Sequence, residues 1–439
     1  MKKKLIFTYA FILLTAYNLT PQNSLAWQRA NTMGKGINMP NWLEAGWLGD
    51  YYPAEPPYTY EDLDVLKSVG IKTVRLPIIF EWITDENPPY QPLPTASAQK
   101  AFKYVDTIIK WTTKLNMNVI IDNHHGRDLT DENYQAQIPR LTGMWKNLAQ
   151  RYGDLNPDRH FFELRNEPKN DINNPNLRTV QQAIINAIRQ VNTTHTLIVG
   201  ANWWNAGWAL VQETTPYTDD NIIYTFHNYT PYEYTHQQVS WANWLPAATW
   251  PDQDRGWTEE SLKNEFLDVK TWSNTQKVPV FLGEFGVVTP ADAESRCRWI
   301  SAVGKVLAEI NIPWAYWDVK YRNESFGIFT DQTVATNEIT PCFKAALGLN
   351  NITVQTTEHQ IDAFIVRYEP QTANIYITAP TLKTGNIHIY NVAGKQIYQG
   401  TITNQKKQIN ASEWAKGVYI AVIKNTAKGT IQSTKIIIY

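Results

Sequence analysis

The sequence predicts an α/β protein in which an eight-stranded (β/α)8 TIM barrel is followed by a small all-β sandwich domain. Between Met33 and about Gly348, eight short apolar runs alternate with amphipathic segments of helical periodicity, as a parallel barrel requires. After Asn350 this periodicity stops, and residues 352–439 contain short strand-like runs separated by turns. A doubly wound open sheet is the alternative for the first region, but the glycine-rich loop that usually follows its first strand is missing from this sequence.

The first 26 residues have the pattern of a secretory signal peptide. Three lysines at positions 2–4 precede an apolar run at 5–14, and small residues at 24–26 suit cleavage near Ala26. A transmembrane anchor is the alternative, but the apolar run is too short to span a bilayer. We therefore expect export and removal of residues 1–26.

The barrel domain is expected over residues 27–349. Its eight predicted strands are Gly36–Met39, Thr73–Pro77, Asn118–Asp122, His160–Leu164, Thr196–Gly200, Ile222–Phe226, Val278–Gly283 and Pro313–Trp317. The clearest helical patterns between them are Tyr60–Val69, Ala98–Lys114, Leu141–Arg151, Leu177–Val191 and Arg296–Glu309.

The tail domain is expected over residues 353–439, with the boundary near Leu349–Thr353. Turns at 393–395 and 427–429 separate some of its strands. The predicted strands are Ile361–Tyr368, Ala373–Thr378, Gly385–Tyr390, Ile397–Thr403, Gly417–Asn425 and Ser433–Ile438.

Composition limits the function. The formal net charge of −1 gives no reason to expect a polyanionic partner, so nucleic acid is not an expected ligand. The chain has 18 Trp, 23 Tyr and 14 Phe, whose flat faces can stack on sugar rings but also fill ordinary cores.

Cys297 and Cys342 are the two cysteines of the chain. In an exported protein they can form a disulfide, and two separate buried thiols are the alternative. Two cysteines are too few for a structural zinc site, and no HExxH motif or clustered His/Asp spacing suggests a catalytic metal. We expect no metal and no cofactor.

A polar or aromatic residue stands at the end of almost every predicted barrel strand. These positions meet at one end of a barrel, where reactive groups lie, and core packing alone does not predict the pattern. The residues are Asn38, Arg75, His124, Asn166-Glu167, Trp203-Trp204, His227 with Tyr229, Glu284, and Trp317-Asp318.

Glu167 and Glu284 follow strands four and seven, which face each other across the mouth of an eight-stranded barrel. Retaining glycoside hydrolysis needs a proton donor and a nucleophilic carboxylate about 5–5.5 Å apart. A salt-bridged carboxylate at a strand end is the alternative for either glutamate alone. The two together favour a catalytic pair.

With these strand-end residues and the glutamate pair in this order along the chain, residues 33–348 resemble glycoside hydrolase family 5, the cellulase family. Asn166-Glu167-Pro168 is similar to the acid/base motif of that family, and Gly283-Glu284-Phe285-Gly286 to its nucleophile motif. The motifs occur in the family's order. The others are Val74-Arg75-Leu76-Pro77, Ile120-Ile121-Asp122-Asn123-His124-His125, Phe226-His227-Asn228-Tyr229 and Trp317.

The chemistry of retaining hydrolysis sets the expected role of each carboxyl group. Glu167 must be protonated before attack and then act as a base toward water, so a raised pKa suits it. Glu284 must be ionised, and we expect Arg75 to lower its pKa and the Tyr229 hydroxyl to donate to it.

The remaining site residues are expected to bind or orient the sugar. Asn166 is assigned to the 2-OH, His124 to the 3-OH, and Trp317 to the hydrophobic floor of the −1 subsite. His227 is expected to orient Glu167. Asn38 belongs to the same group of strand-end residues.

Several of these positions have a structural alternative. Arg75 can be a barrel salt bridge, and His124 can be a core histidine, with His125 competing for its role. We favour His124 because strand alternation then aims it inward beside Asp122. Trp204 is a candidate sugar platform, but it can equally pack under the loops with Trp203 and Trp208.

Other tryptophans lie in loops. Those at 241, 244, 250 and 257 follow strand six, and Trp244 or Trp250 is a candidate for stacking on the leaving-group side of the cleft. Pro40 and Trp42 depart from the small residues that the family usually has in the first loop. A bulky Trp42 can add a stacking face or narrow the cleft, which affects substrate preference.

The tail resembles the sorting domain of type IX secretion. Its features are Ile387-His388-Ile389-Tyr390-Asn391-Val392-Ala393-Gly394-Lys395, then Trp414-Ala415-Lys416-Gly417-Val418-Tyr419-Ile420, then a final strand ending at Tyr439. The resemblance implies contact with the secretion machinery, followed by removal of the tail or attachment at the cell surface. A carbohydrate-binding module is the alternative, with Tyr376, Tyr390, Tyr398 and Trp414 as scattered candidates.

The sequence therefore predicts a secreted or surface-attached retaining endo-β-1,4-glucanase, expected as a monomer, acting on cellulose, β-glucan or mannan. A β-mannanase or a xyloglucan or mixed-linkage glucanase is the alternative on the same site. A non-catalytic glycan-binding protein on an inactive barrel is the hypothesis from another class.

Overall fold

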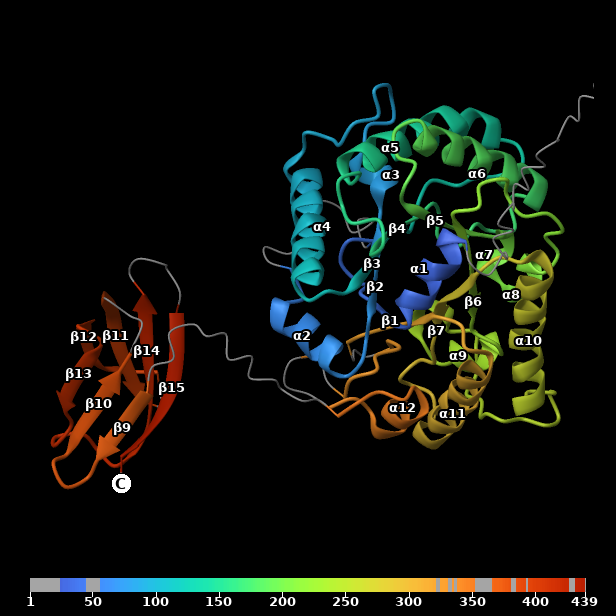
Figure 1. Cartoon of the computed structure of the whole chain (residues 1–439). Coiled ribbons are helices and arrows are strands. Elements are labelled where there is room, and N and C mark those ends of the chain that lie inside the picture. The colour runs from blue at the N-terminus through green and yellow to red at the C-terminus, as the bar shows by residue number, and fades with distance from the viewer. Residues whose placement is uncertain are drawn as a thin grey trace, which may run out of the picture. The chain divides into compact units, whose positions relative to one another are not determined.

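The computed structural model describes residues 24–44, 56–320, 324–330, 334, 338–351, 365–379, 384–391, 394–425 and 431–438. The chain divides into two compact units, Met1–Thr353 and Val354–Tyr439, each with its own core (Figure 1). Within the described part of the chain, no helix combines the length and apolar character that a membrane span requires.

The first unit is a closed parallel barrel of eight strands in sequence order, which confirms the predicted fold. The ring closes because Gly36 pairs with Thr73 on one side and with Ala315 on the other. The strands are β1 (Lys35–Asn38), β2 (Thr73–Ile78), β3 (Asn118–Asn123), β4 (His160–Glu163), β5 (Thr196–Gly200), β6 (Ile222–Asn228), β7 (Val280–Phe285) and β8 (Trp314–Tyr316).

Helices surround this barrel (Figure 1). The longer ones are α2 (Tyr60–Ser68), α4 (Ala96–Lys114), α5 (Tyr134–Arg151), α6 (Asn174–Arg189), α10 (Glu259–Gln276) and α11 (Ala293–Ile310). Short helical segments lie in the connections: α3 (Phe80–Ile83), α7 (Asn202–Asn205), α8 (Gly207–Leu210), α9 (Tyr232–Thr235), η3 (Ser240–Ala242) and α12 (Pro341–Ala346).

Local sequence explains where these helices begin. Thr59 and Asp62 form a reciprocal capping box at the start of α2, and Asn173 caps α6. The predicted start of α5 at Leu141 is too late, because the helix begins at Tyr134 and contains Pro139. The proline is exposed, so water can bond the carbonyl that its missing N–H leaves free.

The helix α1 (Leu25–Met33) packs at the end of the barrel opposite the strand-end residues. Its Ala26, Ala30 and Met33 form a buried cluster with barrel residues such as Phe161 and Phe281. Residues 1–23 of the predicted signal peptide lie outside the described residues, and the predicted cleavage near Ala26 falls in the first turn of α1. Cleavage there remains a prediction.

Cys297 in α11 and Cys342 in α12 form a disulfide, with their Cα atoms 5.5 Å apart. Of the two alternatives that the sequence left open, pairing is therefore correct. The bond ties the short last helix of the barrel to its neighbour.

The second unit is an antiparallel all-β domain, as predicted. Its sheet order is β15-β14-β11-β12-β13-β10-β9, and Thr403 pairs with Lys406 where β12 meets β13. Its core is largely isoleucine. The strands are β9 (Ile365–Glu369), β10 (Asn374–Thr378), β11 (Thr384–Asn391), β12 (Gln396–Thr403), β13 (Lys406–Asn410), β14 (Gly417–Asn425) and β15 (Ile431–Ile438).

The strand β13 was missed by the sequence analysis. Its sequence is Lys-Lys-Gln-Ile-Asn, and Ile409 is its one buried side chain. A strand with a single apolar residue has no alternation to detect, so pairing with β10 decides its conformation.

Candidate active site

A cleft of about 930 Å³ opens where the carboxyl ends of the barrel strands meet. It is bordered by side chains from several connections, among them Glu167, Glu284, His227 and Tyr229. Aromatic residues supply much of the remaining wall. The structure thus brings most of the predicted site residues together.

Glu284, in β7, is a buried carboxyl group with two strong hydrogen bonds. Arg75 donates from Nη1 to its Oε1 at 2.6 Å, and the Tyr229 hydroxyl donates to its Oε2 at 2.9 Å. Both bonds are made to the ionised form, so both favour a negative charge on Glu284.

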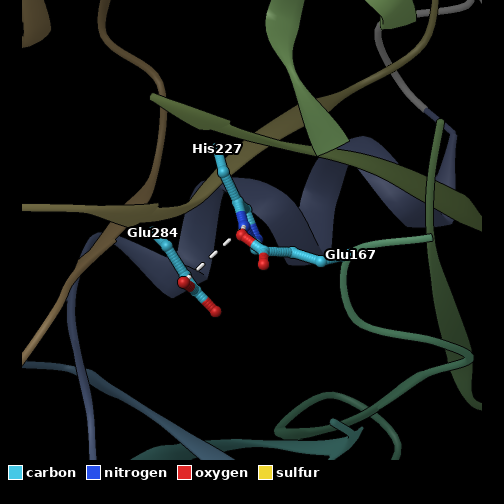
Figure 2. Close-up of side chains that lie close together, drawn as sticks. All are labelled: Glu167, His227 and Glu284. Carbon is cyan, nitrogen blue, oxygen red and sulfur yellow. Dashed lines mark hydrogen bonds and ion pairs between the residues drawn. The ribbon is translucent and has the colours of Figure 1, made fainter. Parts of the chain in front are cut away.

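Glu167 lies in the connection after β4 and is less enclosed, with 26% of its side chain exposed. Its φ of 40° is in the left-handed region, where a non-glycine residue needs support from its surroundings. His227 Nδ1 lies 2.8 Å from Glu167 Oε1 and 3.7 Å from Glu284 Oε2. Figure 2 shows the three side chains converging, and each offers an atom within 4.8 Å of the others.

Burial raises the pKa of Glu167 to about 7, with Arg75 opposing the rise and Glu163 adding to it. Burial also raises the pKa of Glu284 to about 7, although His227, Arg75 and the Tyr229 hydrogen bond act to lower it. Arg75 therefore acts on Glu284 in the expected direction, but burial has the larger effect. When the two carboxyl groups together hold one proton, the hydrogen bonds from Arg75 and Tyr229 favour the ionised form of Glu284. The proton is then on Glu167.

Arg75, in β2, is fully buried and links several carboxyl and amide groups. It donates to Glu163 from Nε at 2.7 Å and to Asn166 Oδ1 at 2.7 Å, and its Nη2 lies 3.0 Å from Asp122. It is therefore both a barrel ion-pair residue and a neighbour of Glu284. Glu163 was not among the predicted site residues, although a charge within the apolar run of β4 was the available signal.

Asn38, in β1, is buried beneath the site. Its side-chain oxygen accepts from Arg75 Nη1 at 3.0 Å, and its amide donates to the Gly283 carbonyl at 3.0 Å. Asn38 is not among the residues that border the cleft. It holds Arg75 in place.

The two neighbouring histidines after β3 both border the cleft. His124 Nδ1 lies 2.6 Å from Asp122 Oδ2, and its ring stacks on Trp317 with the centroids 5.4 Å apart. Burial lowers the pKa of both histidines, that of His125 to about 3. His124 thus has the inward position that strand alternation predicts, and Trp317 forms the adjoining wall.

The tryptophans divide into exposed and buried groups. Trp204 borders the cleft and is 43% exposed, so it is not packed under the loops. Trp244 is 68% exposed but is not among the cleft residues. The prediction for Trp250 is wrong, because this ring is only 1% exposed and belongs to the core.

The expectation for Trp42 is also wrong. The ring is 3% exposed, stacks on Tyr104 and donates its N–H to the Met39 carbonyl. It fills the core beside the first connection and offers no free face to a sugar.

A buried carboxylate that the sequence analysis missed supports the loops behind the site. Glu81, in α3, accepts from Arg165 Nη1 at 2.6 Å, Arg140 Nη2 at 2.7 Å and the Arg127 backbone N–H at 3.0 Å. Asn123 donates to it at 3.2 Å. Arg127 and Arg165 belong to the connections that carry His124 and Glu167, and Arg140 belongs to α5, so Glu81 joins the segment that contains α3 to both connections and to α5.

Glu167, His227 and Glu284 form the group of potential metal ligands within the described residues. The neighbours of these three side chains disfavour a bound metal cation. The Arg75 guanidinium already lies against Glu284, and a metal ion would have to approach this positive charge.

The family model for cellulase, glycosyl hydrolase family 5, matches residues 28–323. The chain belongs to glycosyl hydrolase family 5. A second model, the secretion system C-terminal sorting domain, matches residues 369–439, so the β-domain is a secretion-sorting domain.

Curated relatives of this family 5 chain include endoglucanase 3 of Fibrobacter succinogenes, 29% identical over 354 residues. That match covers 69% of this chain and 52% of the relative, so the chain spans about half the length of that protein. Endoglucanase H of Acetivibrio thermocellus is 30% identical, with 71% of this chain but 32% of the relative covered. Endoglucanase C of Acetivibrio thermocellus is 27% identical and matched over 93% of its length.

Solved structures agree with the family 5 fold. The endoglucanase Cel5A of Thermotoga maritima is 30% identical, with a TM-score of 0.62, and the match covers 73% of this chain and 98% of that one. Structures of the same enzyme in complex with cellobiose and with mannotriose match with TM-scores of 0.63.

Proposed function

We propose that this chain is a secreted retaining endo-β-1,4-glucanase in which Glu167 is the acid/base and Glu284 the nucleophile. The observation that carries the proposal is the pair of facing carboxyl groups, which offer oxygen atoms within 4.8 Å of each other. Inverting enzymes hold their carboxyl groups about 6.5–9.5 Å apart to admit a water, so the short separation supports retention.

The first step forms a covalent intermediate. A Glu284 oxygen attacks the anomeric carbon, the glycosidic C–O bond breaks, and Glu167 gives its proton to the leaving oxygen. The bonds from Arg75 and Tyr229 support this role, because they stabilise the carboxylate before attack and orient it. His227 holds Glu167 at 2.8 Å, and burial lowers the pKa of His227 to about 4, so it is neutral at pH 7.

The second step releases the sugar. Esterification removes the negative charge of Glu284, so the pKa of Glu167 falls and Glu167 stays ionised after giving its proton to the leaving group. Glu167 then accepts a proton from water, the water oxygen bonds to the anomeric carbon, and Glu284 leaves as a carboxylate. The configuration of the first product is therefore that of the substrate.

The substrate class follows from relatives and from the cleft. Family 5 relatives named endoglucanase, and a related enzyme solved with cellobiose and with mannotriose, favour β-linked glucan first and mannan second. Asn166 and His124 lie beside the carboxyl pair, where the 2-OH and 3-OH of the bound sugar are expected. The sorting domain supports export, with the first 26 residues acting as signal peptide.

The test is the release of reducing sugar from carboxymethylcellulose, mixed-linkage glucan, xyloglucan and mannan. We expect the highest rate on a β-1,4-glucan and a loss of at least 10⁴-fold for Glu284→Ala, as for other groups that act as one catalytic unit. Azide should restore turnover to Glu284→Ala with an inverted product, since it replaces the missing nucleophile. Equal rates for the wild type and Glu284→Ala would contradict the proposal. An inverted configuration in the first product of the wild type, measured by NMR, would also contradict it.

A further inference from the structure

Four buried side chains beside the carboxyl pair form a closed cycle of contacts. Arg75 Nη2 lies 3.0 Å from Asp122 Oδ2, and the same oxygen lies 2.6 Å from His124 Nδ1. His124 Nε2 lies 3.4 Å from Asn166 Nδ2, and Asn166 Oδ1 accepts from Arg75 Nη2 at 2.7 Å. The cycle therefore joins β2 and β3 to the connections that follow β3 and β4.

Asp122 is the member of this cycle to which the proposed mechanism gives no role. As a counter-charge for Arg75 it is one of several, because Glu163 and Glu284 also accept hydrogen bonds from that guanidinium. Its contact with His124 is not duplicated in the described part of the chain. Its other oxygen, Oδ1, is buried and has no hydrogen-bond partner among the described residues. The contact with His124 is thus the distinctive feature of Asp122.

This contact decides which ring nitrogen of His124 carries the proton. Burial lowers the pKa of His124 well below its usual value, so the imidazole is neutral at pH 7 and has one N–H. Asp122 Oδ2 acts as an acceptor, because it also faces the Arg75 guanidinium. The proton is therefore on Nδ1, and Nε2 is an acceptor.

The protonation of His124 in turn orients the Asn166 amide. With a lone pair on Nε2, Asn166 turns its NH2 group to His124 and its oxygen to Arg75, so donors meet acceptors. With a proton on Nε2, two donors would face each other. The amide would then have to turn and place its NH2 group against the Arg75 guanidinium, which is also a donor. The cycle is consistent with one orientation of Asn166.

Resting on the proposed function, in which Asn166 binds the 2-OH of the sugar, we propose that Asp122 is a positioning residue for that contact. By accepting from His124 Nδ1, it fixes the tautomer that turns the Asn166 NH2 group to His124 and leaves its second N–H for the sugar. A hydrogen bond to the 2-OH strengthens in the transition state. Loss of Asp122 should therefore affect kcat more than KM.

Two substitutions separate this role from a purely electrostatic one. Asp122→Val offers no acceptor, whereas Asp122→Asn keeps an oxygen for His124 and loses the charge that faces Arg75. The quantity measured is the ratio of kcat/KM for 2,4-dinitrophenyl β-cellobioside to that for its analogue without the 2-OH of the −1 sugar. We expect Asp122→Val to lower this ratio at least tenfold and Asp122→Asn to keep it within threefold of the wild type.

The matched control is Glu163→Gln, which removes another carboxylate from Arg75 but none from His124. It should leave the ratio within twofold of the wild type, whatever its effect on the rate. An Asp122→Asn enzyme whose ratio falls as far as that of Asp122→Val would overturn the inference, because Asp122 would then act through its charge.

Nitrogen-15 NMR of the histidine side chains reads the tautomer without turnover, and the signal lost in His124→Gln assigns it. We expect a proton on Nδ1 in the wild type and in Asp122→Asn. A proton on Nε2 in the wild type would overturn the inference even if Asp122→Val does not fold. A wild-type protein with the expected tautomer that hydrolyses neither substrate would refute the proposed function and leave the role of Asp122 toward His124 standing.

Discussion

Single residues decide how the two carboxyl groups differ. Glu284 receives hydrogen bonds from Arg75 and Tyr229, whereas Glu167 faces neutral His227. Burial raises the pKa of both carboxyl groups to about 7. The proposed mechanism needs Glu284 ionised and Glu167 protonated, so we expect activity to fall on both sides of about pH 7.

Replacing Tyr229 by Phe should move the acid limb of the pH–activity profile to higher pH. The Tyr229 hydrogen bond lowers the pKa of Glu284, so its loss raises that pKa and demands a higher pH for ionisation. We expect the acid limb of kcat/KM on cellohexaose to shift upward by about half a unit or more, since a net hydrogen bond is worth about 1 kcal/mol. An acid limb that stays in place, or moves down, would contradict this account of Glu284.

At the scale of elements, Glu81 connects α3 with the loops after β3 and β4. Gly126 makes this possible, because a Cβ there would come within 2.0 Å of the Glu81 carboxylate. Burial acts to raise the pKa of Glu81, but Arg165 and Arg140 outweigh it, so the pKa lies below its usual value. A lowered pKa means that ionised Glu81 stabilises the fold above the pKa of the unfolded chain and that this contribution is lost in acid.

Glu81→Gln should therefore lower the free energy of unfolding by about 3–5 kcal/mol at pH 7, because it leaves two largely buried arginines without the carboxylate that neutralises them. Denaturant unfolding measures the change. The loss should shrink as the pH falls below about 4, where the carboxylate of the wild type is protonated. The control is Glu86→Gln, whose exposed pair with Arg127 is worth less than about 1 kcal/mol. Equal effects of the two substitutions would refute the role of Glu81.

The predicted signal-peptide cleavage near Ala26 would remove part of the first turn of helix α1. Ser24 caps it, with the Trp27 backbone N–H donating to the Ser24 hydroxyl at 3.4 Å, and Ala26 is fully buried. A chain that begins at Trp27, as the predicted cleavage requires, lacks both features.

We expect a chain that begins at Trp27 to be less stable than one that begins at Ser24 by at least about 1 kcal/mol, the usual value of an N-cap. Urea unfolding of the two proteins measures the difference, and Ser24→Ala in the longer chain separates the cap from the burial of Ala26. Mass spectrometry of the exported protein identifies the natural start. Equal stability would show that the first turn of α1 is dispensable.

At the scale of the whole molecule, the proposed catalytic site and the sorting domain belong to different compact units. The barrel contains every proposed site residue, and the sorting domain has its own isoleucine core. A unit with its own core can be removed without exposing the core of the other.

Deleting residues 354–439 should leave kcat/KM on carboxymethylcellulose within twofold of that of the full chain and abolish export. Activity assays on purified proteins and immunoblots of culture fractions measure the two effects. A tenfold loss of binding to insoluble cellulose after the deletion would instead favour a carbohydrate-binding module. The Glu284→Ala full chain should still be exported.

The sequence alone determined the order of strands and the residues at their ends. Both follow from local patterns, because side chains alternate along strands and parallel strands bring their carboxyl ends to one mouth. The pairing of Glu167 with Glu284 and the positions of Arg75 and Tyr229 could therefore be predicted.

Only the tertiary structure decided what depends on contacts between distant segments. The disulfide, the partners of Glu81 and the strand β13 arise from neighbours far away in the sequence. The same holds for exposure, since Trp250 is buried and Trp204 is not, although the two residue types are identical. Whether an indole is buried or exposed depends on the conformation of its backbone. Trp204 has a left-handed backbone conformation, and its N–H donates to the Pro168 carbonyl.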